Sequence, residues 1–415
     1  MTSPRPILRT APTRQGWIVV VCAAATGVMG RLFGVIELYF LSAALAIAAA
    51  GAFLAVLFRR PRVGVRRWVR PEVLTAGDVG RVDVVVRAKG IGWRPNFELI
   101  ESVGTDRTAR MAVTPMRAGA EKSAGYRVPT ERRGVLTIGP LLAVRGDVLG
   151  LARSVSCVAG VDELLVAPRA FELRMPELGQ GILGRHLLAQ SVRLGPGEFH
   201  SLREYVPGDE PRTIHWRASA RSDELKVRQH SAEGLRRCTV VLDQQVPPGD
   251  EHDEAFERAV VAAASLVHSA DQAGLETRFA TTAGVDLRGP TVSVHTMHHL
   301  ARVMPDQLAP TGIERDPGEG LGLVFIITPT PASAAFATLG EMRDPTLTLL
   351  GVFTEETAGR PRLSVDAHTE AAFLDSWLGL VGRGRRPTYF SVNPLGGRPD
   401  SLDDPASAMT GLSAS

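Results

Sequence analysis

A run of 21 residues without a charge, from Leu38 to Phe58, limits what this chain can fold into more than any other feature. At about 1.5 Å per residue, a helix over this run is roughly 31 Å long, which matches one hydrocarbon core of a bilayer. A buried core helix is the alternative, but such helices rarely lack charge over this length. The run therefore predicts a transmembrane helix.

A second apolar run lies just before it, from Trp17 to Gly30. It spans a bilayer only if its helix continues to about Ile36, with the Arg31 guanidinium reaching outward to the headgroups. A secretory signal peptide is the alternative, but another apolar run follows at once, with no soluble chain between them. Residues 17–58 are therefore predicted to form two transmembrane helices.

Arginines flank this pair of helices on both sides. They are Arg5, Arg9 and Arg14 before it, and Arg59, Arg60, Arg62, Arg66, Arg67 and Arg70 after it. Since arginine is enriched in cytoplasmic loops, both ends are predicted to be cytoplasmic. The expected location is the inner cell membrane, with membrane lipid as a partner. Residues 1–16 are expected to be a cytoplasmic N-terminus and 59–70 a basic juxtamembrane linker.

The charge of the remaining chain bears on its partners. The chain has 47 Lys+Arg and 44 Asp+Glu, and ten of the basic residues but one of the acidic residues lie before Pro71. The rest therefore carries 37 basic and 43 acidic residues, a net charge of −6. An acidic body argues against nucleic acid as a partner. Three scattered cysteines are too few for a disulfide framework or a zinc knuckle.

Residues 71–168 show short alternating runs rich in β-branched residues. Examples are 82–86, 97–103 and 135–142, with Gly, Pro, Asn and Asp between them. Such runs predict strands, and no helical period of a dozen residues interrupts them. The expected fold is a small antiparallel β-sandwich that acts as a spacer or docking surface.

Residues 236–394 alternate between strand and helix patterns. The strand pattern at 238–243 precedes an amphipathic helix pattern at 254–273, which Gly274 ends, and further strands are expected at 321–329 and 347–353. This alternation predicts a doubly wound α/β domain. Residues 395–415, rich in Gly, Pro, Ser and Asp, are predicted to be a disordered tail.

Between these two domains lies a densely charged stretch, Leu194 to Glu233, which we call the central segment. Its arginines and carboxylates alternate, as in an ion-pair network, because the guanidinium fork binds carboxylates through two bonds. One interpretation, which we favour, is a structural junction between the two domains. The other is a surface that grips a partner or an anionic ligand through Arg203, Arg212, Arg217 and Arg221.

The central segment resembles the signature of a bacterial family, the domain of unknown function 58 (DUF58), which would span 169–235 here. The matching positions are Arg203, Tyr205, Gly208, Asp209, Arg212, Ile214, Trp216, Ser219, Ala220, Arg221 and Glu233. The resemblance implies an N-terminal membrane hairpin and a von Willebrand factor A-like C-terminal domain. It also implies a MoxR-type AAA+ ATPase as partner, and often a transglutaminase-like membrane protein. No biochemical activity is established for the family.

The resemblance selects the candidate site, either as a partner-binding surface or as a structural network. Its residues are Arg203, Tyr205, Gly208, Asp209, Arg212, Trp216, Ser219, Arg221 and Glu233. Trp216 is expected to be buried, so that Trp216→Ala would cost roughly 3–5 kcal/mol of stability.

A von Willebrand A domain often carries a Mg²⁺ site of the pattern Asp-x-Ser-x-Ser after its first strand. Here Asp243 supplies the leading carboxylate, but Gln245 and Pro247 stand at the serine positions, and Thr328 and Thr330 stand where a later Asp would be expected. Mg²⁺ needs more hard oxygen ligands than this. The sequence therefore predicts a degenerate site, no bound metal and no cofactor.

No spacing of nucleophile, base and orienting group is visible, so the chain is not expected to be an enzyme. The expected function is that of a membrane-anchored cytoplasmic adaptor or scaffold. It would work with a MoxR-type AAA+ ATPase in envelope or complex-assembly processes. The alternatives are a ligand- or metal-binding sensor of the von Willebrand A type and a cell-envelope enzyme.

Overall fold

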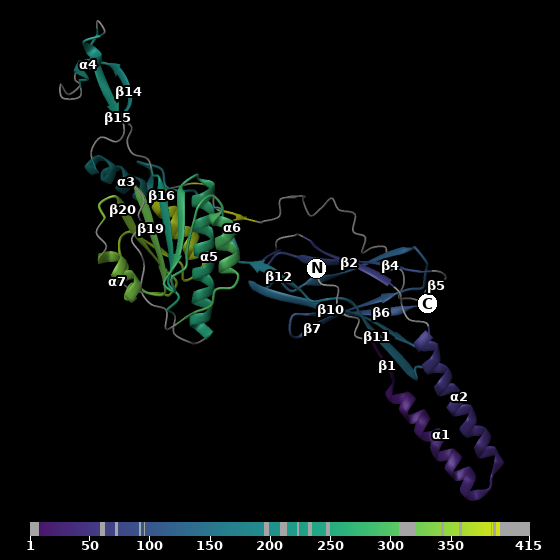
Figure 1. The fold of residues 1–415 in the computed structure, drawn as a ribbon. Helices are drawn as coiled ribbons and strands as arrows, with labels where there is room; N and C mark the ends of the chain where they lie inside the picture. The colour runs from purple at the N-terminus through teal and green to yellow at the C-terminus, as the bar shows by residue number, and fades with distance from the viewer. Residues whose placement is uncertain are drawn as a thin grey trace. The chain divides into compact units, whose positions relative to one another are not determined.

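The computed structural model divides the chain into two compact units, with the boundary between Val166 and Ala167 (Figure 1). The residues that the structure describes are 8–58, 63–70, 74–90, 93–94, 96–194, 199–207, 214–221, 224–230, 235–245, 250–306, 320–341, 344–356, 359–382, 384 and 387–390. Several sequence predictions lie outside the described residues, namely those for Gly208, Asp209, Arg212, Glu233, Pro247 and the tail 395–415.

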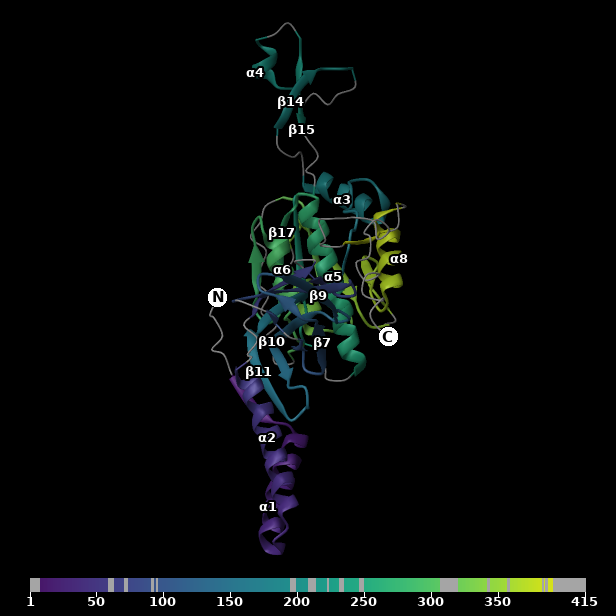
Figure 2. The same ribbon diagram turned by 90° about the vertical axis from the view of Figure 1, so that its right-hand side faces the viewer.

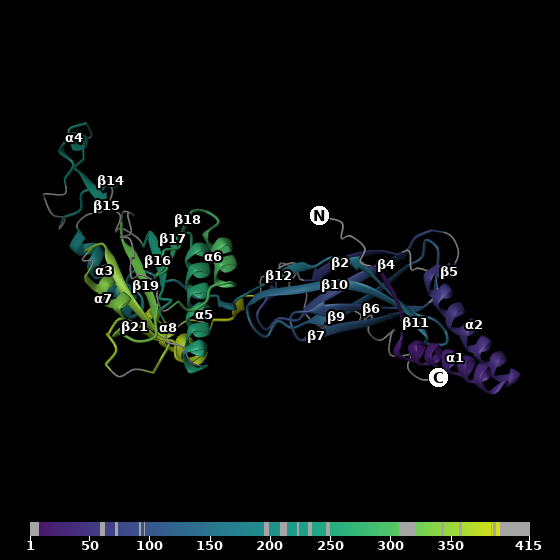
Figure 3. The ribbon, with the colours of Figure 1, turned by 60° about the horizontal axis from the view of Figure 1, so that its bottom comes forward.

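Two long apolar helices lie near the start of the first unit, as the sequence predicts. They are α1 (Arg14–Phe33) and α2 (Ile36–Phe58), and both are long and apolar enough to cross a membrane. Gly34 takes a left-handed conformation (φ 71°) that ends α1, so the two helices turn back and run side by side (Figures 1 and 3). The Ser42 hydroxyl of α2 donates a hydrogen bond to the Ala23 carbonyl of α1 at 2.7 Å.

Two larger sheets and a short two-stranded one form the rest of the first unit. The larger holds β1 (Leu8–Pro12), β3 (Leu74–Thr75), β6 (Phe97–Val103), β7 (Arg107–Val113), β10 (Gly134–Gly146), β11 (Ala152–Ala159) and β12 (Asp162–Ala167). The smaller holds β2 (Val63–Arg70), β4 (Gly80–Ala88) and β9 (Glu121–Val128), and a separate pair joins β5 (Trp93–Arg94) to β8 (Met116–Arg117). Alternate residues of β4, such as Val82 and Val84, are buried against Leu99 and Leu141 of the larger sheet.

Strand β1 was not expected from the sequence. It precedes α1 and pairs antiparallel with β11, with Ala11 opposite Arg153 and Pro12 opposite Ala152. The chain therefore enters the helical pair from the larger sheet and leaves it into β2 of the smaller sheet.

A buried ion-pair group links the two sheets. The Arg67 guanidinium of β2 contacts the carboxylates of Glu101 and Asp162, and the Tyr126 hydroxyl donates to Glu101 at 2.9 Å. Glu101 is fully buried, whereas most of the Asp162 side chain is exposed. Burial, together with the neighbouring Glu101 charge, raises the pKa of Tyr126 far above its usual range.

The second unit is built on a mixed sheet in the order β18-β17-β16-β19-β20-β21. Its strands are β16 (Arg237–Leu242), β17 (Glu276–Thr281), β18 (Asp286–Arg288), β19 (Gly322–Thr328), β20 (Leu347–Phe353) and β21 (Ser364–Asp366). All neighbours are parallel except the edge pair β17 and β18. The mixed α/β content predicted from the sequence is thus present.

Helices cover both faces of this sheet, so every residue of its central strands β16 and β19 is buried. They are α3 (Gly181–Leu194), α5 (Asp250–Gln272), α6 (Val292–Leu300), α7 (Ala334–Glu341) and α8 (Glu370–Val381), and β13 (Ala170–Phe171) pairs with β22 (Tyr389–Phe390) beside them. Val240 and Leu242 belong to the cluster that includes α5, α6 and α8, while Val241 faces the cluster of α7. Figure 2 shows α3 and α8, which are in contact, side by side.

Candidate functional site

The described part of the central segment folds as a small element of its own, which we call the central hairpin. Strand β14 (Phe199–Glu204) pairs antiparallel with β15 (Lys226–His230), and the Tyr205 N–H extends the ladder to the Leu225 carbonyl at 2.8 Å. Ile214 adds an isolated bridge to Val227. The side chain of Val227 is buried and provides the apolar interior of this element.

A four-residue helical turn, α4 (Trp216–Ser219), is fastened to β15 by polar contacts. The His215 N–H donates to the Lys226 carbonyl at 2.7 Å, and the His215 Nδ1 accepts from the Ala218 N–H at 3.0 Å. The Ser219 hydroxyl oxygen is buried and accepts from the Lys226 N–H at 2.8 Å. Ser219, a predicted site residue, therefore has a structural role in fixing α4.

Trp216 lies on the surface of the central hairpin, with 65% of it exposed. The prediction that this indole is buried is wrong. A two-stranded hairpin with one helical turn has too few side chains to enclose a tryptophan, and Val227 already occupies its interior. Val206 and Leu225 are exposed as well, so the hairpin presents several large apolar side chains to solvent.

The expected ion-pair network is visible only in part. Lys226 Nζ lies 3.7 Å from a carboxylate oxygen of Glu204 and 3.7 Å from one of Glu224. Arg217 and Arg221 are exposed, and neither forms an ion pair with a carboxylate in the described part of the chain. For Arg203 the structure describes only the backbone, in β14, and Tyr205 is half-buried. The hairpin thus brings Tyr205, Ser219 and Arg221 into one element with Trp216 on its surface.

A second candidate lies at the carboxyl ends of the parallel strands, where Asp243 follows β16. This carboxylate is almost fully buried. It accepts hydrogen bonds from the Thr328 hydroxyl at 2.9 Å and the Gln245 N–H at 3.0 Å, and the hydroxyls of Thr282 and Ser333 lie near enough to lower its pKa. Burial raises the pKa of Asp243, and these donors partly offset the rise.

The sequence identified Asp243 and Thr328 but missed Thr282 and Ser333. Thr282 directly follows the end of β17, and Ser333 lies in the loop after β19, so the available signal was a hydroxyl residue beyond the end of each of these strand patterns. These groups do not fit Mg²⁺, because a single carboxylate whose oxygens already accept hydrogen bonds leaves too few free hard ligands. No group of three or more His, Cys, Asp or Glu side chains suited to a metal occurs among the described residues.

The fold and the two candidate sites define a class of protein. It has two N-terminal apolar helices, an antiparallel β unit, and a mixed α/β unit that carries the central hairpin between α3 and β16. Residues 201–318, which include most of that hairpin, match the family described as "Protein of unknown function DUF58". This match confirms the DUF58 assignment drawn from the central segment.

Several solved structures are similar to parts of this chain, with low TM-scores. The CARDB domain of the PF1109 protein from Pyrococcus furiosus has 15% identity and a TM-score of 0.19, over 26% of this chain and 88% of that chain. The PKD domain of an M14-like peptidase from Thermoplasmatales archaeon SCGC AB-540-F20 has 14% identity and a TM-score of 0.17, over 25% and 92%. The alkylpurine DNA glycosylase AlkC of Pseudomonas fluorescens has 14% identity and a TM-score of 0.18, over 30% and 38%. Among curated proteins, no match is found.

Proposed function

We propose that this protein is a membrane-anchored adaptor whose central hairpin docks a partner protein, a MoxR-type AAA+ ATPase by family resemblance. One observation carries the proposal, namely the exposure of Trp216 on a hairpin that is otherwise held by backbone and side-chain hydrogen bonds. A buried Trp216 would have favoured the structural-junction interpretation. Its exposure favours the partner-binding surface.

The chemistry of the hairpin surface supports a protein partner. Tryptophan and arginine are the side chains that contribute most to protein–protein binding energy. Trp216, Arg217 and Arg221 are exposed together on or beside α4, and Leu225 adds apolar surface next to β15. Because the two guanidinium groups have no carboxylate partner in the described part of the chain, they are available to acidic groups on the partner.

The connections of the helical pair support the proposed topology. Strand β1 before α1 and strand β2 after α2 belong to the same compact unit, so both ends of the pair lie on the same side of a membrane that it spans. The arginines at both flanks favour the cytoplasmic side. We accordingly place both termini and both units in the cytoplasm, anchored to the inner membrane.

We assign the mixed α/β unit a von Willebrand A-like fold. Support comes from the strand order, which reverses between β16 and β19, and from the buried carboxylate of Asp243 at the end of β16. The donor set around Asp243 argues against the alternative of a metal-dependent sensor. In the adaptor, the hydrogen bond from Thr328 to Asp243 ties the ends of β16 and β19 together.

Binding to the ATPase tests the proposal. Full-length protein in lipid nanodiscs is immobilised and exposed to the MoxR-type ATPase of the same organism, with a non-hydrolysable ATP analogue or with ADP. We expect binding at micromolar concentrations that depends on the nucleotide. Equal absence of binding in both nucleotide states would contradict the proposal.

A further inference from the structure

The tight turn between β10 and β11, residues 147–151, carries two exposed apolar side chains. The Asp147 carboxylate organises the turn by accepting hydrogen bonds from the Leu149 N–H at 2.8 Å and the Ala152 N–H at 2.6 Å. Val148 is completely exposed at the tip, and Leu149 is 60% exposed. Two large adjacent aliphatic side chains on such a tip are unfavourable in water, which suggests that something apolar covers them.

This turn is fixed against the beginning of α1. The Thr13 N–H donates to the Leu151 carbonyl at 2.8 Å, and the Thr13 hydroxyl donates to the Gly150 carbonyl at 2.6 Å. A Cβ on Gly16 would lie only 2.0 Å from the Leu151 oxygen, so only glycine permits this approach. The turn therefore holds a set position beside the first turns of the helix.

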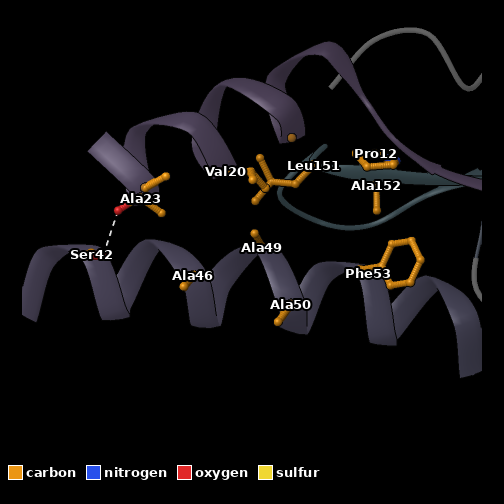
Figure 4. Close-up of a pocket in the computed structure, with 12 residues that line it drawn as sticks. Pro12, Val20, Ala23, Ser42, Ala46, Ala49, Ala50, Phe53, Leu151 and Ala152 are labelled. Carbon is orange, nitrogen blue, oxygen red and sulfur yellow. Dashed lines mark hydrogen bonds between the residues drawn. The ribbon is translucent and has the colours of Figure 1, made fainter. Parts of the chain in front are cut away.

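The turn also extends along α1 into its apolar part. Figure 4 shows Leu151 beside Val20. Val20 lies seven residues after Thr13, which corresponds to about 10 Å along the helix axis. Over this length the outward side chains of α1 are already those of a lipid-facing helix, since Trp17 and Ile18 are exposed. The apolar tip of the turn continues that surface.

Basic side chains lie on the other side of the tip, toward the sheet. Arg9 and Arg153 share one face of the β1–β11 pair, because Ala11 is opposite Arg153 and Arg9 is two residues from Ala11. Arg14 begins α1, and all three arginines are exposed. In the part of the chain that the structure describes, none of them is paired with a carboxylate. Phosphate groups of lipids would match this charge.

An apolar cavity of about 530 Å³ lies behind the turn, between α1 and α2 (Figure 4). Val20 and Leu151 line one side of it, and Ala46, Ala50 and Phe53 of α2 line the other. Its lining suits an acyl chain of the same lipid whose headgroup the arginines would contact.

We propose that the β10–β11 turn is a membrane-inserting wedge. Val148 and Leu149 enter the interfacial layer of the bilayer beside α1, Arg9, Arg14 and Arg153 contact lipid phosphates, and the cavity accommodates an acyl chain. The first unit is thereby held against the membrane surface by more than its two helices. This inference rests on the proposed membrane span of α1 and α2.

Spin-label accessibility in the full-length protein tests the wedge. In a background with Cys22, Cys157 and Cys238 replaced by alanine, single cysteines are introduced by Val148→Cys, Val161→Cys or Ile47→Cys, labelled, and reconstituted in anionic vesicles. Val161 is an exposed valine just beyond the opposite end of β11, an eight-residue strand about 26 Å long. Ile47 is an exposed residue of α2. Accessibility to oxygen and to a water-soluble nickel complex is measured for each label.

We expect the label at position 148 to behave like that at position 47, with several-fold lower nickel accessibility than the label at position 161. A membrane-inserted label at 47 with an aqueous label at 148 would overturn the wedge while leaving the membrane span intact. Aqueous labels at both positions would overturn the span as well.

A second measurement does not depend on replacing the native cysteines. Val148→Trp and Val161→Trp are made in the otherwise unchanged chain, and vesicles with brominated acyl chains quench indoles that reach the lipid. The wedge predicts additional quenching in Val148→Trp relative to the unsubstituted protein and none in Val161→Trp. Equal changes in the two variants would contradict it.

Discussion

The hydroxyl oxygen of Ser219 accepts a hydrogen bond from the backbone N–H of Lys226 at 2.8 Å. This contact fastens the helical turn α4 to strand β15, and it does so with a side chain that is buried. Trp216, in the same turn, remains exposed. The central hairpin is thus built so that small polar residues hold its shape while its largest side chain faces outward.

Replacing Ser219 tests whether this contact holds α4. In Ser219→Ala the Lys226 N–H loses its acceptor, which costs about 1 kcal/mol of local stability. Hydrogen exchange at the Lys226 amide should therefore become several-fold faster. Ala220→Ser, a change at the exposed neighbouring position, serves as the control and should leave exchange unchanged. Unaltered exchange in Ser219→Ala would show that the contact does not protect this amide.

Gly16→Ala should destabilise the first unit. The added Cβ would meet the Leu151 carbonyl at 2.0 Å, so either the turn or the helix must move, at a cost of about 1–3 kcal/mol. Gly51→Ala is the matched control, because Gly51 is a helical glycine of α2 with open space around it. That change should be neutral or stabilising by up to about 1 kcal/mol. Thermal unfolding in nanodiscs measures both, and equal midpoints would refute the close approach.

Glu101→Gln should be strongly destabilising. It leaves the buried Arg67 guanidinium without its buried counter-charge, a change that typically costs about 3–5 kcal/mol. Asp162→Asn removes the other, largely exposed carboxylate from the same guanidinium and should cost less than about 1 kcal/mol. Denaturant unfolding of the full chain compares the two variants. A larger loss in Asp162→Asn would reverse the assigned importance of the two partners.

Asp286 should contribute a pH-dependent part of the stability of the second unit. Hydrogen bonds from Arg288 and Arg278 hold the pKa of this carboxyl far below its usual range. A depressed folded-state pKa gives stability that is fully present above the unfolded pKa of about 4 and is lost as the pH falls below it.

Asp286→Asn removes this contribution. Its loss of thermal stability between pH 6 and pH 3 should therefore be smaller than that of the unsubstituted protein. Asp253→Asn, at an exposed carboxylate of α5, controls for the general effect of removing one acid. A pH dependence that is the same in all three proteins would contradict the role given to the two arginines.

Sequence patterns predicted the features that depend on local composition. An uncharged run such as Leu38–Phe58 specifies a helix through its own residues, and the positions around Arg203 to Arg221 identified the family. Strand β1 escaped prediction because Leu8–Pro12 is short and contains both an arginine and a proline. Its partner, β11, lies some 140 residues further along the chain, and only that pairing makes it a strand.

The candidate sites show the same division between local and distant information. Asp243 was visible at the end of an apolar strand, but its polar neighbours Thr282 and Ser333 come from other loops that only the folded sheet brings together. The burial of Trp216 was inferred from its residue type and its apolar neighbours. Burial depends on how much structure surrounds a side chain, and the central hairpin is too small to enclose this one.

The measurement that most directly tests the adaptor proposal compares two tryptophan variants in ATPase binding. Trp216→Ala removes the exposed indole of the central hairpin, while Trp68→Ala removes an indole of β2 in the first unit that is 43% exposed. Loss of an exposed interface tryptophan typically costs at least about 2 kcal/mol of binding, roughly a thirtyfold weaker affinity. We predict that weakening for Trp216→Ala, with little change in its thermal stability, and unchanged affinity for Trp68→Ala. Equal affinities of Trp216→Ala and the unsubstituted protein would contradict the central claim.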